Sequence, residues 1–296
     1  MFALWDHTYR RWFASLEKQR IRCRQGLISV REPPGEMAFA SFEPPVARGS
    51  VLLFHGTGND ALFGWNFWIE GLLERGLRVL AVDLDGHGHA SNTTLSHESF
   101  AESMREINTW LLVEGWSKDS VSICAYSLGG LYALEAIARG HIAPDRLVLL
   151  ALPLTIDLSL RFFWAEAMTA FHPMFWRHIF AFGWRASIPA FGTWRREAYP
   201  VRLKDHDDLS YPQAIAALFK ARNPLTRAAI CRSPTLLIHG SEDYLAPADA
   251  GYKLKEVLSQ SALCVIPKAN HFLLPWFPSS LKAGLDWLSL SNVALS

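Results

Sequence analysis

The chain has 296 residues, of which 50% are hydrophobic and 19% are charged, and its formal net charge is +1. This balance is typical of a globular protein with a large buried core and excludes an intrinsically disordered chain. Because the body of the chain has neither a strong positive charge nor a dense run of Lys and Arg, we expect no nucleic-acid partner.

Residues 1–26 predict an amphipathic helical extension. Aromatic and leucine side chains recur near helical spacing between residues 2 and 16, and basic residues follow as far as Arg24. Such a helix either packs on its own protein or contacts a membrane surface weakly through residues 2–24. We expect packing, with membrane contact as the alternative. Without a secretory signal or a membrane span, the location expected is cytoplasmic, or else peripheral to a membrane.

Short apolar strands alternate with helical segments from residue 50 onwards, which predicts an α/β fold with a mainly parallel sheet covered by helices on both faces. Two earlier strands, 27–31 and 37–43, flank Pro33-Pro34-Gly35 and predict an antiparallel hairpin. The later strands are expected at 50–54, 78–83, 120–125, 146–151, 235–239 and 262–266, and the helices near 61–75, 98–114, 128–139, 247–259 and 278–289.

The strand pattern stops for about eighty residues between Ala151 and Thr235, which is too long for a simple connection. We therefore divide the chain into a core of residues 27–152 and 231–296 and a helical cap of residues 153–230. The cap is rich in aromatic side chains, including Trp164, Trp176, Trp184, Trp194 and Phe191.

The strongest local motif is Ala125-Tyr126-Ser127-Leu128-Gly129-Gly130, at a predicted strand-to-helix junction. A serine on such a sharp turn is pushed out of the backbone, and small neighbours prevent clashes. The helix that follows presents backbone N–H groups to a developing oxyanion, so Ser127 is a candidate nucleophile. On its own, the motif is also compatible with an ordinary turn at the start of a helix.

Three further elements follow predicted parallel strands, whose carboxyl ends line the ligand crevice of such a sheet. The backbone N–H of Thr57, in His55-Gly56-Thr57-Gly58, is a candidate oxyanion donor together with that of Leu128, and the His55 side chain is expected to support the loop. Asp243 is a candidate for orienting an imidazole. His271 is a candidate general base and acid.

These pieces together resemble the α/β-hydrolase superfamily over about residues 27 to 290, in its capped esterase and lipase branch, which includes lysophospholipase-like and monoacylglycerol-lipase-like proteins. The resemblance is carried by HGTG, DLDGHGHAS at 83–91, AYSLGG, GSEDYLAP at 240–247 and NHF at 270–272. It implies Ser127 as nucleophile, Asp243 as acid, His271 as base, and Thr57 and Leu128 as oxyanion donors. The loop at 83–91 is expected to shape the fold.

Two residues depart from the family pattern: Ala125 and Asn270 stand where glycine is common. We interpret both as details that remove no reacting group. Asp157, shortly after the strand at 146–151, is an alternative to Asp243 as the acid, and we prefer Asp243.

The function predicted is a serine hydrolase that cleaves a carboxylic ester with an apolar acyl or aromatic group. A thioesterase, an acyltransferase or a carbon–carbon bond hydrolase would use the same residues. A hydrolase-fold protein that binds a ligand without turnover is the alternative from another class. No metal or organic cofactor is expected, because the four cysteines are scattered and no metal-ligand cluster or dinucleotide fingerprint is present.

Overall fold

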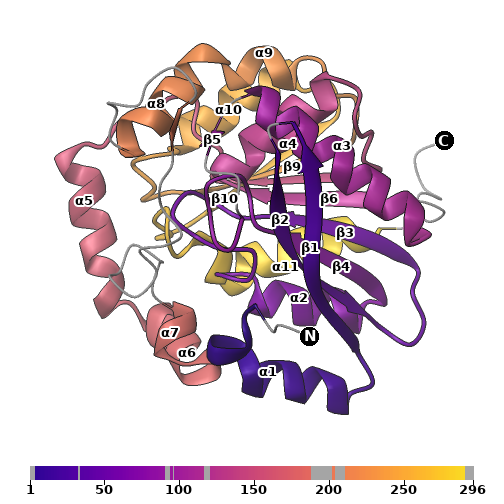
Figure 1. Ribbon diagram of the computed structural model, residues 1–296. Coiled ribbons are helices and arrows are strands. Elements are labelled where there is room, and N and C mark those ends of the chain that lie inside the picture. The colour runs from indigo at the N-terminus through magenta and orange to yellow at the C-terminus, as the bar shows by residue number, and fades with distance from the viewer. Residues whose placement is uncertain are drawn as a thin grey trace.

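An eight-stranded sheet runs through the centre of the computed structural model, which describes residues 4–32, 34–90, 94–95, 97–116, 121–187, 202–203 and 211–290 (Figure 1). Its strands are β1 (Arg22–Arg31), β2 (Pro34–Glu43), β3 (Gly49–Phe54), β4 (Leu77–Val82), β6 (Val121–Tyr126), β7 (Leu147–Leu150), β9 (Thr235–Gly240) and β10 (Ser261–Ile266). They lie in the order β1-β2-β4-β3-β6-β7-β9-β10. From β4 to β10 all neighbours pair in parallel, whereas β2 pairs antiparallel with both β1 and β4.

The central strands are apolar because both of their faces are buried. In β3, Leu52 and Phe54 belong to one hydrophobic cluster, while Val51 and Leu53 belong to the cluster on the opposite face. Side chains alternate between the two faces of a strand, so a continuous apolar run serves two separate cores.

Helices cover both faces of this sheet. Helices α3 (His97–Val113), α4 (Leu128–Ala138) and α10 (Ala248–Val257) pack on one face, and α1 (Asp6–Lys18), α2 (Asn66–Glu74) and α11 (Pro278–Ser289) pack on the other (Figure 1). The short strands β5 (Thr94–Leu95) and β8 (Arg202–Leu203) form a separate parallel pair. The predicted fold class, a mainly parallel sheet between two helical layers, is confirmed.

The amino-terminal hairpin is longer than the sequence indicates. Strand β1 begins at Arg22, inside the segment assigned to the extension of residues 1–26, and Cys23 pairs with Phe42 across the hairpin. Most of β1 is only partly buried because it is the edge strand. Its backbone pairing therefore continues through a polar stretch that carries no apolar strand signal.

The aromatic face of α1 packs against the protein itself. Trp5, Tyr9, Trp12, Phe13 and Leu16 are all buried. The indole N–H of Trp12 donates to Glu70 Oε1 at 2.8 Å, and the Phe13 ring stacks on Phe42 with centroids 5.7 Å apart. While α1 is docked in this way, these side chains are not available to a membrane. Phe2 lies outside the described residues.

The segment between β7 and β9, where the sequence places a cap, contains helices and the short strand β8. The helices are α5 (Leu160–Ala167), the 3₁₀ helix η2 (Met168–Phe171), α6 (Pro173–Phe182), α7 (Trp184–Ser187), α8 (Tyr211–Ala221) and α9 (Pro224–Ala228). Phe191 and Trp194 lie outside the described residues.

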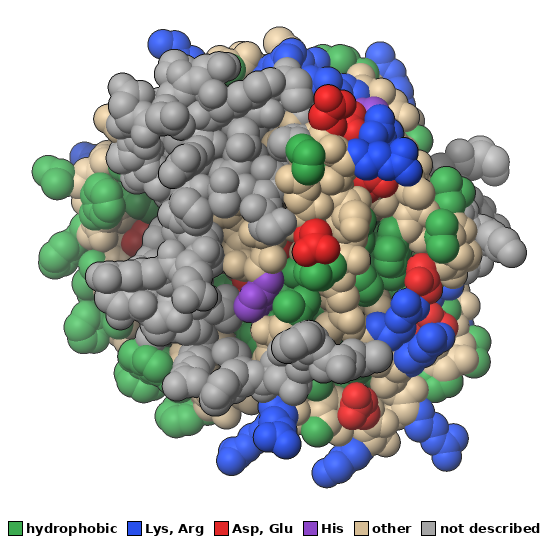
Figure 2. All heavy atoms as spheres, in the orientation of Figure 1, with side chains coloured by type: hydrophobic (Ala, Val, Ile, Leu, Met, Phe, Trp, Pro, Cys, Tyr) green, Lys and Arg blue, Asp and Glu red, His purple; other side chains and the backbone are tan. Residues whose placement is uncertain are grey.

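Large apolar side chains on this segment face outwards. Figure 2 shows them along the left edge, over α5 and α6, and those most exposed include Leu160, Trp164, Phe171 and Phe180. Among the described residues of these two regions, the exposed aromatic side chains thus lie on this segment rather than on α1. Within the described parts of the chain, no helix is both long enough and apolar enough to cross a membrane.

We expect Trp12→Ala to lower the free energy of unfolding by about 3 kcal/mol or more, since the change removes a buried indole and leaves a cavity. Arg10→Ala on the exposed face of the same helix should change it little. Urea denaturation of both variants measures the difference. Equal effects of the two substitutions would mean that α1 is not docked on the sheet.

Candidate active site

Ser127 occupies a strained turn between β6 and α4. Its backbone has φ +52° and ψ −114°, a conformation that non-glycine residues rarely adopt, and its side chain is directed out of the backbone at the carboxyl end of β6. Helix α4 approaches β3 so closely here that a Cβ atom on Gly129 would lie 2.4 Å from the Phe54 carbonyl oxygen. Glycine at position 129 is therefore required for the turn.

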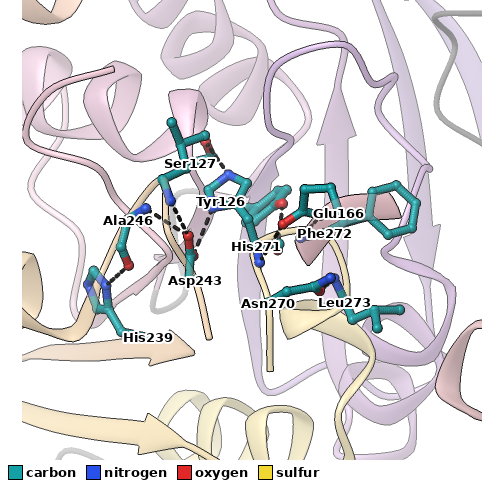
Figure 3. A network of polar contacts seen from close by, with 11 residues as sticks. Tyr126, Ser127, Glu166, His239, Asp243, Ala246, Asn270, His271, Phe272 and Leu273 are labelled. Carbon is teal, nitrogen blue, oxygen red and sulfur yellow. Dashed lines mark hydrogen bonds and ion pairs between the residues drawn. The ribbon is translucent and has the colours of Figure 1, made fainter. Parts of the chain in front are cut away.

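Ser127, His271 and Asp243 form a continuous hydrogen-bonded chain. His271 Nε2 lies 3.0 Å from Ser127 Oγ, and its Nδ1 lies 2.8 Å from Asp243 Oδ2. Asp243 is fixed in turn, because its Oδ1 accepts from the backbone N–H groups of Leu245 at 2.9 Å and Ala246 at 2.7 Å. Figure 3 shows the imidazole ring between the other two side chains. The loops after β6, β9 and β10 supply the three residues at one edge of the sheet.

The surroundings of His271 favour a ring that can accept a proton. Burial lowers its pKa, but the charge and hydrogen bond of Asp243, with the charge of Glu166, outweigh burial and raise the pKa above its ordinary value. With Nδ1–H donating to the carboxylate, the lone pair of Nε2 faces Ser127. The Tyr126 hydroxyl donates to the His271 carbonyl oxygen at 2.9 Å and holds the backbone beneath the ring.

Asp157, the alternative acid, is exposed after β7. The structure pairs the imidazole with Asp243.

A cavity of about 630 Å³ opens above Ser127. Thr57, after β3, lines it beside Ser127, and Leu128 is the first residue of α4, where backbone N–H groups have no acceptor within the helix. The lining is mostly apolar and comes largely from the segment between β7 and β9. Its apolar members include Ile156, Leu158, Phe162, Phe163, Phe175, Ile215, Leu245 and Phe272.

Comparison with known proteins gives the family. A family model described as "Serine aminopeptidase, S33" (Hydrolase_4) matches residues 45–275. The chain belongs to this α/β-hydrolase family. The AB hydrolase superfamily protein YisY of Bacillus subtilis (strain 168) is similar at 22% identity, over 78% of this chain and 88% of that protein.

Solved structures agree on the fold. The esterase RhEst1 from Rhodococcus sp. ECU1013 superposes with a TM-score of 0.64 at 20% identity, covering 90% of this chain and 98% of that one. The meta-cleavage product hydrolase CumD from Pseudomonas fluorescens IP01 gives 0.64 at 20% identity, covering 89% and 96%. The family match confirms the predicted superfamily, while the lysophospholipase-like and monoacylglycerol-lipase-like branch stays a prediction.

His55 supports the loop that carries Thr57 in this α/β-hydrolase. Its Nε2 accepts from the backbone N–H of Leu84 at 3.0 Å, so its Nδ1 donates to the Gly56 carbonyl oxygen at 2.7 Å. Burial, with the nearby His87, holds the pKa of His55 well below its ordinary value, so the ring is neutral. A neutral imidazole with both ring nitrogens hydrogen-bonded to the backbone holds the loop in place and has no free nitrogen for proton transfer.

The structure describes the loop at 83–91 as far as residue 90, and the side chains of this part hold neighbouring segments together. Asp83 accepts from the backbone N–H groups of Ala61 at 2.6 Å and His89 at 2.5 Å, and the Ser103 hydroxyl donates to Asp85 at 3.0 Å. Burial raises the pKa of Asp83 to about 7. These contacts tie the turn after β4 to its neighbours.

Sequence analysis missed Glu166, a carboxylate from α5 that lines the cavity beside Ser127 and His271. Burial raises its pKa to about 7, although the nearby His271 acts to lower it. No motif surrounds this residue, and only the docking of α5 brings it to the site. Asn270, interpreted from the sequence as a loop detail, is buried and hydrogen-bonded to the same segment.

Asp243→Asn should lower the pKa of His271. Burial lowers this pKa, and the substitution removes the negative charge that offsets it. Asp157→Asn, the matched change at an exposed position, should leave the pKa unchanged. A pH titration of the histidine ring signals by NMR measures both. A similar decrease in the two variants would show that Asp243 is not the partner that fixes the ring.

Proposed function

We propose that this protein is a serine hydrolase that cleaves a carboxylic ester with an apolar acyl or aromatic group through an acyl-enzyme. One observation carries the proposal: the hydrogen-bonded chain of Ser127, His271 and Asp243 lies at the wall of a mostly apolar cavity.

In the first half of the reaction Ser127 Oγ attacks the ester carbonyl carbon, and His271 Nε2 takes the hydroxyl proton. The carbonyl oxygen becomes an oxyanion, to which the backbone N–H groups of Thr57 and Leu128 donate. When the tetrahedral intermediate collapses, the bond to the alcohol breaks and His271 returns the proton to the leaving oxygen. Ser127 is then acylated.

Water completes the cycle by the same route. His271 removes a proton from the water as its oxygen attacks the acyl carbon, and the proton then passes to Ser127 Oγ as the acid leaves. Asp243 stabilises the imidazolium in both halves and keeps Nδ1 protonated. Each reacting group stays within one hydrogen bond of the next, so no large movement is needed.

The cavity favours an apolar substrate. Phenylalanine, leucine and isoleucine side chains dominate its lining, and burial of an acyl chain or aromatic ring against them provides the binding energy. The polar groups, which include Asn59 and Thr169 besides those of the proposed machinery, are few.

A carbon–carbon bond hydrolase is the second candidate, because the structural neighbour CumD is a meta-cleavage product hydrolase. The family description also names an aminopeptidase. A substrate panel of simple esters, thioesters, amino-acid arylamides and dienol-type diketones separates these chemistries, since all can use the same three residues. Ester hydrolysis is expected to be the fastest.

Ser127→Ala should abolish covalent labelling by a fluorophosphonate probe, because the probe reacts with an activated serine hydroxyl. Ser279→Ala, the same change on an exposed serine of α11, should label like the wild type. In-gel fluorescence gives the readout. Absence of labelling in well-folded wild-type protein would remove the covalent mechanism and favour ligand binding without turnover.

Phe162→Ala should lower kcat/KM for long-chain p-nitrophenyl esters about tenfold, equivalent to about 1.4 kcal/mol, because an apolar wall of the cavity is lost. The acetate ester should be affected much less. Phe171→Ala, the same change at an exposed position not found in the cavity lining, serves as the control. An equal decrease of kcat/KM for all chain lengths would mean that the acyl chain does not bind against Phe162.

A further inference from the structure

Glu166 connects α5 to the backbone of the loop that carries His271. Its Oε1 accepts from the His271 N–H at 3.1 Å and its Oε2 accepts from the Phe272 N–H at 3.1 Å (Figure 3). One carboxylate thus holds two consecutive amides. It does so from a segment about a hundred residues away in the chain, and on the cavity side of the proposed base.

Asn270 makes a second connection from the same loop. Its side-chain Nδ2 donates to the Ala165 carbonyl oxygen at 3.0 Å and to Thr169 Oγ1 at 2.8 Å, while its Oδ1 accepts from the Leu273 N–H at 2.9 Å. Asn270 and Thr169 are both buried. Glycine, common at this position in the family, has no side chain with which to make these contacts.

We propose that Glu166 and Asn270 form a latch between the segment α5–η2 and the histidine loop, so that His271 is aligned with Ser127 only while this segment is docked. Both are positioning residues, since they act through the backbone of the loop. The effect on catalysis rests on the proposed function, whereas the latch itself does not.

A carboxylate suits this position because the two amides are both donors. An ionised carboxylate accepts from each with a separate oxygen, but protonation converts one oxygen into a hydroxyl that is a poorer acceptor and brings a donor towards an N–H group. A glutamine at this position likewise has only one oxygen, so one of the two N–H groups would lose its acceptor.

Burial makes the charge of Glu166 costly. The ionisable groups that face Glu166 are His271, Asp243 and Tyr126. Burial raises the pKa of Glu166 to about 7. The raised pKa means that docking disfavours the charged form, and the hydrogen bonds from the two amides offset this cost only in part. The negative charge of Glu166 also raises the pKa of His271. This effect is smaller than that of burial, which lowers the pKa, and smaller than those of Asp243, which raise it.

Glu166→Gln keeps the shape of the side chain but loses its charge and one acceptor. In ester hydrolysis we expect kcat to fall at least about tenfold with little change in KM, because the base is less well aligned. The acid limb of the pH–rate profile should move to lower pH, since the pKa of His271 falls. Glu242→Gln, an exposed neighbour of Asp243, should change neither quantity. A loss confined to KM would make Glu166 a substrate-binding group and overturn the latch.

Amide hydrogen exchange tests the latch without any substrate. Protection of the His271 and Phe272 amides, corrected for intrinsic exchange, should be lower in Glu166→Gln than in the wild type, because glutamine offers one oxygen to the two N–H groups. Thr169→Val, which removes one acceptor of Asn270 at nearly constant volume, should also lower it. Equal protection in wild type and Glu166→Gln would refute the proposal, even if no ester is hydrolysed. If protection falls in Glu166→Gln as expected but the fluorophosphonate probe labels no serine, the latch stands and only the proposed function is contradicted.

Discussion

The hydrogen bond between His271 Nδ1 and Asp243 Oδ2, 2.8 Å long, is the interaction on which the rest of the site depends. A buried imidazole is costly to charge, yet this ring has to carry a proton for part of the proposed cycle. The carboxylate offsets that cost and fixes which nitrogen faces Ser127. Two backbone N–H groups hold Asp243 itself, so the direction of the ring is set by the backbone of the loop after β9.

The parallel sheet makes this interaction possible. Strands β6, β7, β9 and β10 are neighbours and point the same way, so the loops that leave their carboxyl ends meet at one edge. Residues 127, 243 and 271 are far apart in the chain but need only short loops to meet there. The strain at Ser127 and the close approach of α4 to β3 are local consequences of directing a side chain out of that edge.

Both proposals depend on the segment between β7 and β9. It supplies much of the apolar cavity wall, and through Glu166 it also contacts the loop that holds the proposed base. In these proposals, substrate binding and alignment of the base therefore depend on the same segment. The aromatic side chains it leaves exposed are a separate feature of its outer surface, whereas the aromatic side chains of α1 are used for internal packing.

The sequence by itself determined the α/β class and the three loops that carry Ser127, Asp243 and His271. Buried parallel strands are written as short apolar runs, and each of these residues follows such a run within a recognisable motif. Tertiary structure alone decided that α1 is docked, that β1 begins at Arg22, and that Glu166 and Asn270 connect α5–η2 with the histidine loop. An exposed edge strand has no apolar signature, and a contact between distant segments leaves no local pattern, because it depends on how packed elements are placed relative to one another.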